Sequence, residues 1–295
     1  MRTLQYIQGT AEQAVVWQQR VRLQLAHALK LEDLWQEGAA GPLTPQVLNE
    51  DERDGYTYRE LEINSTPGRR VSVVLTLPTA VTAPVPAVVC IHGHGGDRYC
   101  VYDADSIYKG FAGLLAAQGY ATIAVNVGQH AVYEAGRILM GERLWDLWRC
   151  VDYLETLPSV DAGRIGCGGL SLGGEMAMWL GAMDERMRAT LSAGFLTTMD
   201  QMEHNHCMCW KFDGLRELVD YADLYALTAP RALQCQNGLQ EKETQFNVPL
   251  ARTALAQIEP TYRDFGQAPQ LALHVHKGGH EVDAPALLAF FKEHL

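Results

Sequence analysis

The sequence predicts an α/β domain with a mostly parallel central sheet, an antiparallel N-terminal hairpin and helices on both faces. Three observations carry this prediction. Short apolar runs without polar alternation recur from residue 87 onward, which is typical of parallel strands buried on both faces. Segments with helical spacing separate these runs. Before them, residues 56–65 and 70–77 alternate with period 2 and are joined by a turn sequence at 66–69, which indicates a hairpin.

The apolar runs and the segments between them give the expected order of elements. The expected parallel strands are 87–91, 121–126, 164–170, 189–193, 231–236 and 270–276. The expected helices are 107–118, 142–157, 172–183, 248–258 and 284–294. Strands that alternate with helices in this way predict one layered sheet, and nothing from residue 51 to 295 suggests a further division.

The N-terminal region is expected to be helical. Thr10 and Gln13 have capping-box spacing, and apolar residues follow at helical intervals to about residue 34. A Gly/Pro-rich break follows at 38–45. We therefore expect residues 1–50 to form a helical segment packed on a catalytic domain of residues 51–295. The helix could cover one face of that domain or form a dimer contact, so a homo-oligomer is left open.

Composition excludes several classes of partner. The chain has 295 residues, 47% of them hydrophobic, and a formal net charge of −11, which argues against nucleic acid and anionic membranes as partners. No apolar run approaches the ~18 residues of a membrane span. The polar residues 1–13 do not resemble a signal peptide. The seven cysteines are odd in number and scattered, so we expect reduced thiols and a cytoplasmic protein.

One motif indicates the chemistry. Gly169-Leu170-Ser171-Leu172-Gly173 ends an apolar run and is followed at once by a helix-like stretch, which is the strand, sharp turn and helix of a nucleophile elbow. Glycines stand two positions before and after the serine, at 169 and 173, because a Cβ there would clash with the flanking elements. The helix that begins after Ser171 would direct free N–H groups toward an oxyanion.

A serine nucleophile requires a base and an acid that orients it. His280 follows the last expected strand, at the edge of the sheet where Ser171 should also lie, and is the candidate base. The acid should come between them in the chain. Glu241 and Glu243 both lie in the loop after the strand that ends near Asn237. We prefer Glu241, because it is nearer to the strand end, and keep Glu243 as the alternative.

A glycine-rich loop supplies candidate oxyanion donors. His92-Gly93-His94-Gly95-Gly96 follows a strand, and the backbone N–H of Gly93 or His94 could act together with that of Leu172. His92 and His94 could also be read as metal ligands, but the sequence shows no partner near them at metal-ligand spacing.

The segment Glu203-His204-Asn205-His206-Cys207-Met208-Cys209-Trp210 is unusual. Its histidines and cysteines could bind zinc, but the Cys-x-x-Cys spacing is absent, so we expect no metal and activity that survives chelation. We interpret the segment as an insertion over the active site. Its expected pocket wall is Met199, Met208 and Trp210.

With these motifs in place, the chain resembles the α/β-hydrolase superfamily, and more narrowly the dienelactone hydrolase-like and acetyl xylan esterase-like branch of serine esterases. The segments 91–96 and 165–175 carry the resemblance most specifically. It implies an α/β-hydrolase fold, a small-molecule ester substrate such as an acetyl ester or lactone, no cofactor, and Ser171, His280 and the acid as catalytic residues.

The sequence departs from that branch at two places. The acid is usually aspartate, whereas this loop offers Glu241 and Glu243. The Asp-x-Arg-Gly segment often found after the corresponding strand reads Asn126-Val127-Gly128-Gln129 here. Because that segment commonly shapes the pocket, the physiological ester does not follow from the resemblance. A thioesterase, acyltransferase or peptidase of the same fold remains an alternative, as does a catalytically silent binding protein.

Overall fold

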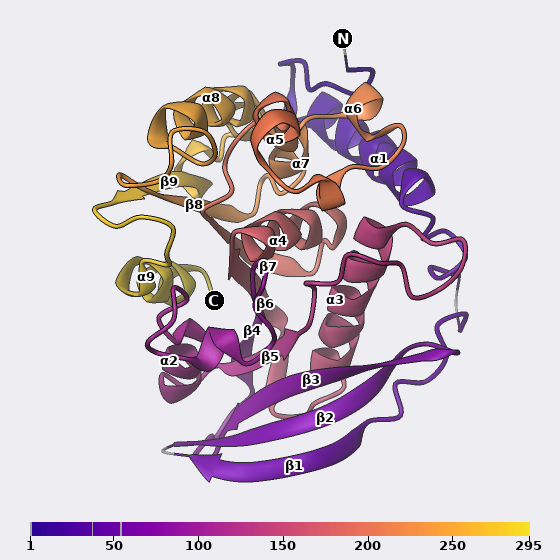
Figure 1. The fold of residues 1–295 in the computed structure, drawn as a ribbon, viewed down its shortest axis with the longest axis vertical. Helices are drawn as coiled ribbons and strands as arrows, with labels where there is room; N and C mark the ends of the chain where they lie inside the picture. The colour runs from indigo at the N-terminus through magenta and orange to yellow at the C-terminus, as the bar shows by residue number, and fades with distance from the viewer. Residues whose placement is uncertain (1, 37, 54) are drawn as a thin grey trace.

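The computed structural model describes residues 2–36, 38–53 and 55–295. It contains a nine-stranded sheet in the order β1-β2-β3-β5-β4-β6-β7-β8-β9. The three N-terminal strands form one end of the sheet, and the later strands continue it past the centre of the molecule (Figure 1). The predicted sheet of mixed direction, mostly parallel with an antiparallel N-terminal part, is confirmed.

The N-terminal end of the sheet is antiparallel. The expected hairpin is formed by β2 (Tyr56–Thr66) and β3 (Arg69–Pro78), and β3 pairs in turn with β5. A further strand, β1 (Gln46–Arg53), pairs with β2 and was not predicted from the sequence. Every residue of β1 is exposed, so the strand lacks the apolar alternation by which a strand is recognised. The boundary expected between residues 50 and 51 falls inside β1.

The remaining strands are parallel, and the mostly apolar sequences of all but the last reflect burial on both faces. They are β4 (Val85–Ile91), β5 (Ala121–Val125), β6 (Val160–Leu170), β7 (Met187–Ala193), β8 (Ala232–Gly238) and β9 (Leu271–His276). Each overlaps an expected strand, and all five pairings among them are parallel. Their carboxyl ends therefore meet at one edge of the sheet, where a ligand site is expected.

Helices cover both faces of the sheet. The longer ones are α1 (Ala11–Ala28), α2 (Phe111–Ala117), α3 (Leu139–Glu155), α4 (Leu172–Met183), α8 (Val248–Asp264) and α9 (Ala284–His294). Helices α2 and α9 share one apolar core, and α1, α3, α4 and α8 share the larger core on the other face (Figure 1). None of the described helices is both long enough and apolar enough to cross a bilayer.

One face of helix α1 packs on the main body. Its residues Trp17, Val21 and Leu25 lie in the larger core. The Gln18 amide donates to the carbonyl of Ala229 at 2.7 Å, and the Trp17 indole donates to Leu4 O at 2.8 Å. The helix ends at Ala28, earlier than the expected residue 34, and its N-terminus has the predicted capping box at Thr10.

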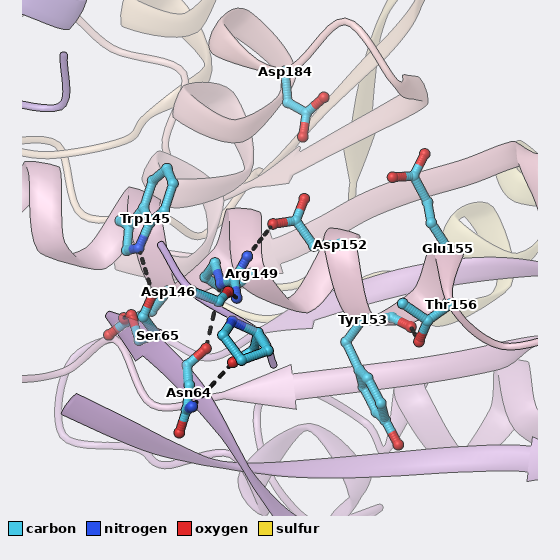
Figure 2. A network of polar contacts seen from close by, with 12 residues as sticks. Asn64, Ser65, Trp145, Asp146, Arg149, Asp152, Tyr153, Glu155, Thr156 and Asp184 are labelled. Atoms are coloured by element: carbon cyan, nitrogen blue, oxygen red, sulfur yellow. Dashed lines mark hydrogen bonds and ion pairs between the residues drawn. The ribbon is translucent and has the colours of Figure 1, made fainter. Parts of the chain in front are cut away.

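Polar contacts along α3 fix the hairpin to the parallel sheet (Figure 2). The Trp145 indole donates to Ser65 O at 2.8 Å, and the Arg149 guanidinium donates to Asn64 O at 3.3 Å. Asp146 accepts two hydrogen bonds from Arg69 at 2.7 and 2.8 Å, and its side chain is almost fully buried. A bidentate buried pair of this kind orients two elements firmly because removing either partner leaves an uncompensated charge.

The segment between β7 and β8 forms several short helices. These are α5 (Met199–Asn205), a 3₁₀ turn at Met208–Trp210, α6 (Leu215–Leu218) and α7 (Tyr221–Ala226). In Figure 1, α5 and α7 lie beside α8, and α6 lies beside α1. The side chains of Phe195 and Tyr221 meet edge to face at 5.0 Å in the larger core, so this insertion has an apolar base.

Candidate active site

Ser171 occupies a strained turn between β6 and α4. Its φ of 62° and ψ of −124° lie outside the regions that ordinary L-residues favour. A Cβ on Gly173 would lie 2.1 Å from Ile91 O, and one on Gly169 would lie 2.5 Å from the same oxygen. Both glycines are therefore required for β4 and the elbow to pass so closely. The turn is held from the other side by Ser171 N–H, which donates to Ala193 O at 2.9 Å.

The glycine-rich loop after β4 lies against the elbow. A Cβ on Gly93 would be 3.0 Å from the Cβ of Ser171. The N–H of Gly93 already donates to the Tyr108 hydroxyl at 2.6 Å. Within the described chain, no acceptor takes the N–H of His94 or that of Leu172, the first residue of α4. Of the two expected donors in this loop, Gly93 is therefore occupied and His94 has the free N–H.

His92 has a structural place in the same loop. It is buried, with Nδ1 2.8 Å from Gly93 O and Nε2 3.0 Å from the N of Val127. Since the Val127 N–H must donate to Nε2, the ring proton sits on Nδ1 and donates to Gly93 O. Burial lowers the pKa of His92, which keeps this neutral form. The ring thus ties the loop after β4 to the loop after β5, and both nitrogens are used.

Glu241 is the carboxylate that meets His280. Its Oε1 and Oε2 lie 2.9 and 3.1 Å from Nδ1 of His280, and its side chain is only 3% exposed. Glu243 is exposed, and its backbone carbonyl accepts from Asn247. Of the two candidate acids, the structure brings only Glu241 to the histidine. With Nδ1–H donating to Glu241, Nε2 of His280 is left as a free base.

Backbone hydrogen bonds join the loops that carry Glu241 and His280. Beyond the end of the β8–β9 pairing, Leu239 N–H donates to His276 O at 2.9 Å, and Gln240 N–H donates to Gly278 O at 2.9 Å. A Cβ on Gly238 would lie 2.3 Å from Gly279 O. The absence of a side chain at position 238 therefore lets the two loops touch.

Two contacts place the imidazole beside the elbow. The Phe246 ring stacks on the His280 ring with centroids 5.4 Å apart and planes 18° apart. On another side, Gly194 has a φ of +57°, and a Cβ there would lie 2.9 Å from Cε1 of His280 and 3.0 Å from Cδ1 of Leu170. Gly194 therefore lies between the His280 ring and Leu170, the last residue of β6, and the absence of a side chain there leaves room for the ring.

A buried carboxyl group lies one turn into α4. Neither oxygen of Glu175 has a hydrogen-bond partner in the described structure. Burial raises its pKa to about 8, against the opposing effects of the Arg143 charge and the Trp179 side chain. We did not select this residue from the sequence, although its position directly after Gly173-Gly174, in an otherwise apolar helix, is visible there.

The three expected pocket residues occupy different environments. Met199 and Trp210 are fully buried in the larger core, whereas Met208 is 42% exposed. Met199 and Trp210 therefore support the insertion from below rather than offer surface to a ligand, and Met208 alone is accessible.

Histidine and cysteine side chains gather where the glycine-rich loop meets the insertion. His94, His130, Cys207 and Cys209 have ligand atoms that all lie within 4.8 Å of one another. The sequence separates them into three segments, so the pattern of neighbouring residues could not reveal the group. His206, which the sequence did suggest as a ligand, is not in the group; its ring packs near His94 and Phe246.

The sheet order, the helices on both faces and the strained serine between β6 and α4 together define the α/β-hydrolase fold. The fold that the sequence motifs predict is thereby confirmed. In agreement, a model of the Abhydrolase family matches residues 5–140. That match includes the glycine-rich loop after β4 and ends before Ser171.

Individual relatives are distant in sequence. The protein YtaP of Bacillus subtilis (strain 168), described as a hydrolase, is 22% identical over 232 residues, which are 69% of this chain and 76% of YtaP. A structure described as an acetyl xylan esterase from Bacteroides fragilis NCTC 9343 has a TM-score of 0.83 at 15% identity, over all of this chain and 91% of that one. A glucuronoyl esterase from Solibacter usitatus has a TM-score of 0.67 at 18% identity, over 85% of this chain and 86% of that one.

Proposed function

We propose that this protein is a carboxylic-ester hydrolase that works through a serine acyl-enzyme. The observation that carries the proposal is the geometry of Ser171: a strained turn at the start of a helix, with the His280–Glu241 pair held beside it. Strain of this kind persists where a function requires it. The esterase descriptions of the similar structures support the same reaction class.

In the first half of the reaction, Ser171 Oγ attacks the ester carbonyl while Nε2 of His280 takes its proton. Glu241 keeps the imidazole in the tautomer that has a free Nε2 and stabilises the imidazolium that forms. The N–H groups of His94 and Leu172 hold the tetrahedral oxyanion, because both are free and lie at the elbow. His280 then gives its proton to the leaving alcohol.

In the second half, water attacks the acyl-enzyme with His280 again as the base, and the acid is released. Apart from the ester and the attacking water, every step uses side chains and backbone groups of this chain. The alternatives of a thioesterase, acyltransferase or peptidase would keep the same groups and change only the acyl donor or acceptor. A catalytically silent binding protein would have no need for the buried Glu241 carboxylate beside His280.

The substrate we propose is a small ester, of the acetyl-ester or lactone-like kind. Support comes from the acetyl xylan and glucuronoyl esterases among the similar structures. We further propose a cytoplasmic location, because all seven cysteines are free thiols rather than disulfides.

Turnover of p-nitrophenyl acetate by the wild type and by Ser171→Ala tests the proposal. We expect measurable wild-type turnover and a loss of at least about 10³-fold in kcat for the variant, since a serine nucleophile cannot be replaced by its neighbours. Equal turnover by the two proteins would contradict the mechanism. A screen of acetylated sugars, lactones and aryl esters would then identify the preferred ester.

A further inference from the structure

Four side chains with metal-binding atoms converge above the active site from three parts of the chain. His94 lies in the loop after β4, His130 in the loop after β5, and Cys207 and Cys209 flank Met208 in the insertion. Their ligand atoms all lie within 4.8 Å of one another, and Nε2 of His94 is 3.0 Å from Sγ of Cys209. His94 and Cys209 are partly buried, whereas His130 and Cys207 are exposed.

The donor set is specific in its chemistry. Two thiolates and two imidazoles are the ligands of a closed tetrahedral zinc site. Around zinc, such atoms would lie roughly 3.3–3.8 Å apart, given metal–sulfur distances of about 2.3 Å and metal–nitrogen distances of about 2.0–2.1 Å. The observed separations of the ligand atoms include that range: they run from 3.0 Å, between Nε2 of His94 and Sγ of Cys209, to at most 4.8 Å. The side chains of His130 and Cys207 are exposed and can rotate to bring their ligand atoms closer to the other two.

We propose that His94, His130, Cys207 and Cys209 bind one Zn²⁺ ion. The ion is a structural one in this arrangement, because four protein ligands leave no open position for water or substrate. It would cross-link the insertion to the loops after β4 and β5.

The surroundings of Arg143 support the site independently. This side chain is fully buried and is part of none of the described ion pairs, although its charge lowers the pKa of the buried Glu175 carboxyl against the effect of burial. Its guanidinium donates to Gln129 O, next to His130, and to Sγ of Cys209 at 3.5 Å. Arg143 thus contacts two of the three ligand segments and would hold them in place around an ion.

This proposal departs from the expectation of no bound metal. The sequence suggested possible ligands within 204–209, where the spacing is poor for zinc, and at His92 and His94, which have no partner nearby in the chain. In the structure, the histidines beside the two cysteines are His94 and His130, which are distant in sequence, and not His204 and His206. Zinc would take no part in the ester chemistry. Its removal would act on activity only through the position of His94, whose backbone N–H is a proposed oxyanion donor.

The test is metal binding by the purified full chain. The wild type, Cys207→Ser, His130→Ala and the control His204→Ala are stripped with chelator under reducing conditions and titrated with Zn²⁺ or Co²⁺ alone. His204→Ala is a matched control because this exposed histidine lies in the same insertion but outside the group. Circular dichroism confirms that each variant is folded, so a loss of binding is not a loss of structure.

We expect one equivalent of Zn²⁺ for the wild type and for His204→Ala, with a rise in Tm on binding. Co²⁺ should give the visible absorption of a tetrahedral site together with thiolate charge-transfer bands. Cys207→Ser and His130→Ala should each weaken binding by on the order of a hundredfold, since each removes one of four ligands. Less than a tenth of an equivalent in the wild type, or equal affinity in all four proteins, would overturn the site. A Cys207–Cys209 disulfide that persists under reducing conditions would also overturn it.

Discussion

Oε1 of Glu241 lies 2.9 Å from Nδ1 of His280, although the two residues are 39 positions apart in the chain. The carboxylate is nearly inaccessible to solvent, whereas the imidazole is one-third exposed. A buried carboxylate that meets one face of a partly exposed imidazole fixes the ring tautomer and leaves the other nitrogen toward the substrate. This pairing distinguishes Glu241 from Glu243 and gives the first prediction.

Glu241→Gln should lower kcat by up to about 10⁴-fold, by analogy with loss of the acid in serine proteases, because the amide cannot stabilise the imidazolium. Glu243→Gln is the matched control and should change kcat by less than about tenfold, since Glu243 is exposed. Both variants should keep a Tm within a few degrees of the wild type. If Glu243→Gln were the inactive variant, the assignment of the acid would be wrong.

Gly194→Ala should impair catalysis more than folding. The added methyl group would lie 2.9 Å from Cε1 of His280, and the positive φ at this position disfavours alanine. We expect kcat to fall on the order of a hundredfold because a displaced base no longer reaches the serine. Gly266→Ala, which also has a positive φ but open space around it, is the control for backbone strain. An equal effect of the two substitutions on kcat would contradict the role of Gly194.

Glu175 predicts a pH dependence of stability. Its pKa is raised to about 8 in the folded protein from an ordinary 4.5, so the folded state retains a proton that the unfolded chain loses between these pH values. Stability should therefore fall as pH rises from 4.5 toward 8. Glu175→Gln carries no such proton, and its free energy of unfolding should exceed the wild-type value increasingly with pH, by on the order of a few kcal/mol at pH 8.5.

Thermal melts of both proteins from pH 5 to 8.5 measure this effect. Glu259→Gln, which removes an exposed carboxylate on α8, controls for the change in net charge. A Tm difference between wild type and Glu175→Gln that stays constant over the whole range would mean that Glu175 is not the titrating group.

The Arg69–Asp146 pair should be one of the stronger links between the hairpin and α3. Arg69→Met leaves the Asp146 carboxylate buried without its cation, which should cost about 3–5 kcal/mol. Arg70→Met, at the next position of β3, removes an exposed pair with Glu62 and hydrogen bonds to Thr44 and Asn64. It should cost about 1 kcal/mol or less, because these partners remain accessible to water. Denaturant unfolding compares the two, and similar losses would show that burial of Asp146 is not decisive.

The sequence predicted the central part of the fold well because burial leaves a direct signature there. Five of the six parallel strands are mostly buried on both faces, whereas the edge strand β9 is only partly buried, and each was located to within a few residues. Strand β1 was missed because all its side chains are exposed, and its pairing with β2 is stabilised by backbone hydrogen bonds that any sequence can make. Helix α8 continues through Pro260 to Asp264, beyond the expected end at 258.

The candidate site was predictable where spacing in the sequence reports local geometry, and less so where distant segments meet. Ser171 and its glycines form one continuous motif. The choice between Glu241 and Glu243 depended on reach from a strand end. The group of His94, His130, Cys207 and Cys209 was not predictable, because its members come together only through the loops after β4 and β5 and the insertion.

The central claim is that Ser171 is the nucleophile, and covalent labelling tests it most directly. Wild-type protein treated with a fluorophosphonate should gain one adduct by mass spectrometry, on the peptide that contains Ser171, because the strained turn and the adjacent base activate this hydroxyl. Ser171→Ala should gain none. An unmodified Ser171 in folded wild-type protein, under conditions that label a control esterase completely, would contradict the account.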